Sequence, residues 1–290
     1  MSESVSPKPP PDDSDESRLK IYFLPNLLTA GNLFCGFVAL TKIVEANLTP
    51  DAFGIVNWMP IKVALAFILL ACIFDLFDGR VARMGGHESP FGREFDSLAD
   101  LISFGAAPAF LVHRIVLRDV LPDEYAELGW FIASIYLICG AFRLARFNCL
   151  SAMNLPGAGK DFLGFPIPSA AGLVASLTLF IIKLNEKEKG LGHWGYLLPV
   201  VLVFLSAMMV SEVKYPSFKS LGLRSSTTFL KLIVAVLFVG FVVILREKIL
   251  YYLLPLFFTG YLLYGFVRPY ISRAWRREIE EDDDEAEAGS

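Results

Sequence analysis

The sequence predicts an all-α protein, a polytopic bundle of about eight transmembrane helices. Hydrophobic residues make up 54% of the 290-residue chain and charged residues only 19%. Soluble domains contain about 45–50% apolar and about 25% charged residues. The apolar residues also gather in stretches of roughly 20, the length that crosses the hydrocarbon core of a bilayer as a helix. These two observations indicate an integral membrane protein.

The expected spans follow one another along most of the chain, between two polar ends. Their approximate ranges are 22–44, 62–84, 94–116, 128–147, 166–184, 194–213, 227–246 and 249–268. Residues 1–20 are acidic and rich in proline and serine, which is typical of a disordered tail. Residues 271–290 are strongly acidic and are interpreted as a second disordered tail.

The distribution of basic residues predicts the orientation. An even number of spans places both termini on one side of the membrane. The Lys and Arg residues outside the spans fall mainly on the side of the termini, and cytoplasmic loops carry such an excess. We therefore expect cytoplasmic termini, with the loop between the second and third spans at the cytoplasmic face.

Four aspartates interrupt the apolar pattern on either side of that loop. Asp75 and Asp78 are three residues apart near the end of the second span, and Asp96 and Asp100 are four apart at the start of the third. Residues at these spacings share one face of a helix. The connection over residues 84–93 contains three glycines and a proline, which favours a tight hairpin of helices packed about 8–10 Å apart. The two pairs should therefore converge.

Such a cluster of carboxylates points to bound cations. Four carboxylates in a small volume cannot all stay ionised without them, and oxygen ligands favour Mg²⁺ or Mn²⁺. The sequence nearby has no Cys or His pair that would indicate zinc. Alternatively, the aspartates cap helices or pair with Arg80, Arg83 and Arg93. Four aspartates on matching helix faces favour a metal site over helix capping or ion pairing, because ionisable residues within a membrane usually serve function.

The aspartates also belong to a longer pattern of fixed spacing. It reads Asp75-x-x-Asp78-Gly79-x-x-Ala82-Arg83, then eight residues, then Gly92-x-x-x-Asp96-x-x-x-Asp100. This pattern resembles, without a departure, the signature of the CDP-alcohol phosphatidyltransferases. The resemblance implies that the four aspartates hold two metal ions against the pyrophosphate of a CDP-linked lipid. It also implies that Asp100 acts as the base.

Three further residues of the pattern are candidates for binding the CDP-linked lipid. Gly79 and Ala82 are small enough for a nucleotide to approach the helix closely, although ordinary helix packing would also select them. The Arg83 guanidinium could donate two hydrogen bonds to a phosphate. An arginine that only extends its side chain to the membrane surface would occur at the same position in the sequence.

Flanking stretches narrow the resemblance to the phosphatidylserine synthase branch of that family. They are PNLLTAGNLFCGF, SPFGREFDSLADLISFGAAPA, RLARFN, FLGFPIPSAAG and MMVSEVKYPSFK. The branch implies transfer of the phosphatidyl group of CDP-diacylglycerol to the hydroxyl of L-serine, with release of CMP, by a homodimer. Residues 21–220 are then the family's six-helix domain, and residues 221–270 add two transmembrane helices without a signature.

Two further sets of polar residues are candidates for substrate contacts. Arg143 and Arg146 end the fourth span on the cytoplasmic side and could bind the serine carboxylate, unless they only anchor the helix at the interface. Asn26, Thr29 and Asn32 lie close to one face of the first span. They could contact cytidine or ribose, or form hydrogen bonds between helices.

Two alternative functions remain at this point. Glycerol phosphate or inositol phosphate could replace serine as the acceptor, which would call for additional basic residues. A cation transporter could use the carboxylates as an ion site, but transporters place such sites near the midplane between repeated halves, and no repeat is visible here. No nucleic-acid partner is expected.

Overall fold

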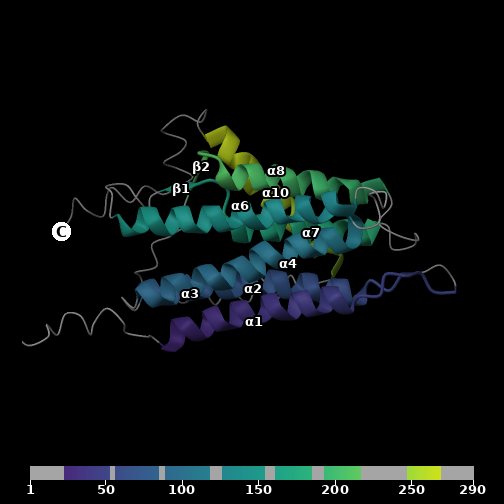
Figure 1. Ribbon diagram of the computed structural model, residues 1–290, viewed down its shortest axis with the longest axis horizontal. Helices are drawn as coiled ribbons and strands as arrows, with labels where there is room; N and C mark the ends of the chain where they lie inside the picture. The colour runs from purple at the N-terminus through teal and green to yellow at the C-terminus, as the bar shows by residue number, and fades with distance from the viewer. Residues whose placement is uncertain are drawn as a thin grey trace, which may run out of the picture.

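The protein is a bundle of long helices that run back and forth along one axis (Figure 1). The computed structural model describes residues 23–52, 56–84, 89–117, 126–153, 161–184, 193–216 and 247–268. Within these residues, six helices are long and apolar enough to cross a membrane. The predicted class, an all-α polytopic membrane protein, is confirmed.

The helices follow the expected order of spans. The first two are α1 (Phe23–Glu45) and α2 (Met59–Met84). The third membrane helix is composite, and its parts are α3 (Pro90–Asp100), η2 (Leu101–Ala106), α4 (Ala107–Val112) and η3 (His113–Leu117). The remaining helices are α6 (Ala126–Ala152), α7 (Ile167–Leu184), η5 (His193–Tyr196), α8 (Leu197–Val210) and α10 (Glu247–Val267).

Two helix ends differ from the ends of the expected spans. The third helix begins earlier than expected, because the Ser89 side chain accepts a hydrogen bond from the Gly92 amide and Pro90 occupies the first turn. The sixth expected span ends early, at Val210. The expected span at 227–246 lies outside the described residues, so the count of eight stays a prediction.

Two short strands join loops at one end of the bundle. β1 (Asp161–Leu163) pairs antiparallel with β2 (Lys214–Pro216), with Phe162 opposite Tyr215. Both strands lie at the end of the bundle where α1 and α3 begin (Figure 1). The loop before α7 and the segment after α8 are therefore tied together at that end.

Small residues set how closely the helices approach one another. A Cβ added to Gly36 of α1 would lie 2.7 Å from the Ser103 Cα of η2. A Cβ added to Gly172 of α7 would collide with the Phe258 ring of α10. Between membrane helices, association depends on such close packing more than on burial from water. These glycines therefore fix α1 against η2 and α10 against α7.

Candidate active site

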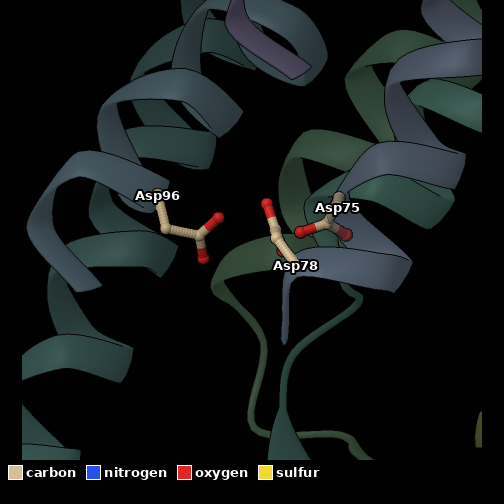
Figure 2. Close-up of side chains that lie close together, drawn as sticks. All are labelled: Asp75, Asp78 and Asp96. Atoms are coloured by element: carbon tan, nitrogen blue, oxygen red, sulfur yellow. The ribbon is translucent and has the colours of Figure 1, made fainter. Parts of the chain in front are cut away.

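The predicted aspartates converge at the end of the bundle that carries the strands. Asp75 and Asp78 lie near the end of α2, and Asp96 lies on α3. Figure 2 shows their carboxylates pointing toward one another from the two helices. One carboxylate oxygen from each lies within 4.8 Å of the other two. The i, i+3 spacing on α2 thus produces the expected shared face.

Asp100 lies one turn further along α3 and is set apart from this group of three. Its side chain is only 6% exposed. Its Oδ1 accepts a hydrogen bond of 3.0 Å from the Asn32 Nδ2 of α1. Asp100 also interacts electrostatically with Asp75, Asp78 and Asp96. It is therefore held in one orientation beside the other carboxylates by a neighbour on a different helix.

Helix α1 supplies a row of polar side chains to the cluster. The buried Thr29 hydroxyl donates to Asp78 Oδ2 over 3.1 Å, and Asn32 donates to Asp100. Asn26 lies beside Gly92 at the start of α3. Thr29 and Asn32 thus form hydrogen bonds between helices, one of the two roles that their spacing allowed, and each bonds to a carboxylate. Their contact with cytidine or ribose stays a prediction.

Several buried polar atoms here lack a partner among the described residues. They are Asn26 Nδ2, Asn32 Oδ1 and Asp96 Oδ1. Buried polar atoms in proteins are nearly always hydrogen-bonded, so such atoms beside a carboxylate cluster fit a site built for a ligand. The donor set of three carboxylates, with neither Cys nor His in the group, fits a hard divalent cation such as Mg²⁺ or Mn²⁺.

The backbone around Asp100 has an unusual geometry. The π-helix η2 starts directly after Asp100, and π-turns inside α-helices are frequent at functional sites. The Ser103 hydroxyl of η2 donates to the Asn32 carbonyl over 2.9 Å. Asn32 therefore connects α1 to the third helix twice, through its side chain to Asp100 and through its carbonyl to Ser103.

The two arginines that end the fourth span occupy different environments. Arg143 is 7% exposed and interacts electrostatically with Asp100 and Asp75. The Arg146 guanidinium donates to the carbonyl oxygens of Leu163, Met209, Val210 and Ser211 over 2.8 to 3.3 Å. Arg143 is thus a buried cation within electrostatic reach of the carboxylates, whereas Arg146 holds β1 and the end of α8 together.

The remaining candidates lie on the last turns of α2. Gly79 follows Asp78 directly and is half-buried. Ala82 and Arg83 belong to the same helix, but their side chains lie outside the described ones. The roles expected of these three residues in binding the CDP-linked lipid stay predictions.

One further residue of this region could not be predicted from a motif in the sequence. Tyr261 of α10 interacts electrostatically with Arg143. It is a polar residue inside a predicted span, near the end expected to be cytoplasmic, and that position was its only signal. The stretch around it matches no motif.

Comparison with known proteins agrees with this geometry. The model of the CDP-alcohol phosphatidyltransferase family matches residues 22–213. The CDP-diacylglycerol–serine O-phosphatidyltransferase of Helicobacter pylori (strain ATCC 700392 / 26695) is 33% identical over 86% of this chain and 91% of its own length. The enzyme of that name from Bacillus subtilis (strain 168) is 34% identical over 68% of this chain and 92% of its own.

A third relative carries a different lipid in its name. The archaetidylserine synthase of Methanothermobacter thermautotrophicus (strain ATCC 29096 / DSM 1053 / JCM 10044 / NBRC 100330 / Delta H) is 30% identical over 72% of this chain and 76% of its own length. The family match covers most of the chain and contains all four aspartates. The chain therefore belongs to the CDP-alcohol phosphatidyltransferase family.

Proposed function

We propose that the protein transfers the phosphatidyl group of CDP-diacylglycerol to the hydroxyl of L-serine, giving phosphatidylserine and CMP. The observation that carries the reaction type is the convergence of Asp75, Asp78 and Asp96 within 4.8 Å at the positions of the family signature. Serine as the acceptor is supported by the names of the relatives, which match over most of their own length.

Two divalent cations, Mg²⁺ or Mn²⁺, are the proposed cofactors. Asp75, Asp78 and Asp96 would hold them, with Asp100 completing the carboxylate set. Bound there, the cations would neutralise charge on the attacked phosphate and on the departing CMP. Thr29 contributes by donating to Asp78, which fixes the orientation of that carboxylate.

Asp100 is the proposed general base. Its carboxylate takes the proton of the serine hydroxyl while the serine Oγ forms a bond to the phosphorus that carries the lipid. The bond from that phosphorus to the CMP oxygen breaks, and CMP leaves with the electron pair. Asn32 donates to Asp100 Oδ1 and so leaves Oδ2 as the oxygen available to accept the proton.

Arg143 is the proposed partner of the serine carboxylate. It is buried and lies close enough to Asp100 to interact with it electrostatically. A serine whose carboxylate binds Arg143 would therefore bring its hydroxyl toward the base. Arg146 uses its guanidinium on four main-chain carbonyls, so Arg143 is the better supported of the two candidates.

The placement of the enzyme in the membrane is also part of the proposal. The site lies at one end of the bundle (Figure 1), and the excess of basic residues on that side supports a cytoplasmic active site with both termini cytoplasmic. We further propose the six-helix domain over residues 21–220, two additional helices over residues 221–270, and a homodimer.

One assay tests the proposed function. Membranes that contain the protein are supplied with radiolabelled L-serine and CDP-diacylglycerol, with and without a chelator, and labelled lipid and free CMP are measured. We expect serine-dependent CMP release that the chelator abolishes. Parallel reactions contain glycerol phosphate or inositol phosphate. Turnover with one of these alone would reject serine as the acceptor, and a complete lack of CMP release would reject the transferase.

A further inference from the structure

Asp96 differs from its neighbours in how its carboxylate is held. The Thr29 hydroxyl donates a hydrogen bond to Asp78. Asn32 likewise donates one to Asp100. By contrast, Asp96 Oδ1 is buried and has no hydrogen-bond partner among the described residues. The direction of this carboxylate therefore depends on its backbone, and so on how α3 is rotated about its own axis.

An asparagine near the end of α6 is hydrogen-bonded to α3 at this point. Asn148 Nδ2 donates to Ser97 Oγ over 3.0 Å and to Glu94 Oε2 over 3.3 Å. Ser97 follows Asp96 directly in the chain. The Ser97 hydroxyl donates in turn to the Arg93 carbonyl over 3.1 Å, one turn back along α3. A single amide group thus holds two successive turns of α3 next to a carboxylate of the site.

Two contact points on one face restrict the rotation of a helix. Glu94 and Ser97 are three residues apart and share a face of α3. Ser97 and Asp96 point about 100° apart around the axis. Side chains of a helix reach about 5–6 Å from its axis, so a rotation of about 10° would move the Asp96 carboxylate by about 1 Å. A misplacement of about 1 Å is enough to slow a reaction by about 100-fold.

We propose that Asn148 is a positioning residue for Asp96. By holding Ser97 and Glu94 it fixes the rotation of α3, and with it the direction in which the Asp96 carboxylate points. This inference rests on the proposed function, because it assumes that Asp96 helps to hold the divalent cations. Removal of the Asn148 amide should therefore weaken cation binding, although Asn148 itself is no ligand.

Asn148→Ala tests the inference in the purified protein. Binding of Mn²⁺ is measured without substrates, by electron paramagnetic resonance of the free ion, and serine-dependent CMP release is measured against Mn²⁺ concentration. We expect the dissociation constant for Mn²⁺ to rise by about tenfold, as for residues that orient metal ligands, and the activation curve to shift by the same factor. The melting temperature should fall by only about 2–4 °C, as for loss of one ordinary hydrogen bond.

Tyr215→Phe is the matched control. It removes a hydrogen bond at the same end of the bundle, from the Tyr215 hydroxyl of β2 to the Leu262 carbonyl of α10. Its melting temperature should fall by a similar amount, while Mn²⁺ binding stays within about twofold of the wild type. A general loosening of the bundle would weaken Mn²⁺ binding in both variants, whereas the positioning role weakens it only in Asn148→Ala.

An exchange of the two side-chain groups provides a rescue. Asn148→Asp replaces the donor by a carboxylate that faces Glu94. The added negative charge alone would strengthen cation binding, so weaker Mn²⁺ binding by this variant reports position and not charge. Glu94→Gln in the Asn148→Asp background restores the original net charge and places an amide donor opposite the new carboxylate. This double variant should bind Mn²⁺ within about threefold of the wild type.

Two results would overturn the inference. One is Mn²⁺ binding by Asn148→Ala within about twofold of the wild type, and the other is a double variant that binds Mn²⁺ no better than Asn148→Asp. Failure of the proposed function gives a different result, namely a wild-type protein that binds Mn²⁺ but releases no CMP with serine. The binding measurements on the variants decide the role of Asn148 in that case too.

Discussion

The contact between Gly36 and Ser103 allows a prediction whose size follows from the structure. Gly36 lies one turn after Asn32 on the same face of α1. A Cβ at this position would lie 2.7 Å from the Ser103 Cα, while ordinary contacts begin at 3.4 Å. Gly36→Ala must therefore push α1 and η2 apart by about 0.7 Å, the difference between these two distances, because backbone cannot swing aside as a side chain can.

That displacement would move Asn32 away from Asp100, the proposed base. The hydrogen bond from Asn32 Nδ2 to Asp100 Oδ1 measures 3.0 Å, and a separation of this size would stretch it beyond the range of hydrogen bonds. Loss of a hydrogen bond to a charged group costs about 1.5–3 kcal/mol, which corresponds to a fall in kcat of about 10- to 100-fold. The KM for CDP-diacylglycerol should change less, since the Gly36 contact is with η2 and not with α2.

The assay is serine-dependent CMP release by purified protein in detergent or vesicles, with thermal unfolding measured in parallel. Gly260→Ala serves as the control, because a Cβ there would meet nothing within 4 Å, and it should retain wild-type kcat. Ser103→Ala in the Gly36→Ala background should restore activity only in part, since the backbone contact remains. A Gly36→Ala protein with wild-type kcat would show that the contact does not position Asp100.

Four further predictions concern the charged residues. Asp100→Asn should lower kcat by about 10³-fold while CDP-diacylglycerol still binds in a metal-dependent manner; surviving activity would show that Asp100 is not the base. Asp78→Asn should shift the Mg²⁺ or Mn²⁺ activation curve about tenfold higher in concentration, and an unchanged curve would count against a metal role. Arg146→Lys cannot reproduce the four carbonyl contacts and should lower the melting temperature by about 4 °C or more. Arg143→Lys should raise the serine KM at nearly unchanged melting temperature, and the reverse pattern would exchange the roles of the two arginines.

The sequence predicted the carboxylate cluster because helical spacing and a short connection leave little freedom. Asp75 and Asp78 must share a face of α2, and a hairpin must bring the start of α3 beside them. The polar face of α1 was predicted for the same reason, and Thr29 and Asn32 now supply hydrogen bonds to two of the carboxylates. Regular periodicity is thus sufficient for the part of the site built from the first three membrane helices.

The residue that binds the acceptor could not be predicted from helical periodicity. Arg143 and Arg146 are three residues apart on one helix, and periodicity alone gives them the same face. Their difference depends on β1 and the end of α8, which bring four carbonyls to Arg146. Tyr261 approaches from a helix more than a hundred residues away, and the π-helix η2 has no sequence signal. Both are consequences of tertiary packing that no local pattern records.

The division of the site between distant parts of the chain has a consequence for its biosynthesis. All four aspartates and their partners on α1 lie in the first hundred residues, whereas Tyr261 lies near the end of the chain. At translation rates of about 5–20 residues per second, on the order of ten to thirty seconds separate the synthesis of the two parts. A nascent chain can therefore assemble its carboxylates in the membrane well before the ribosome completes α10. The contacts that tie α10 to β2, such as the hydrogen bond from Tyr215 to the Leu262 carbonyl, would then be among the last to form.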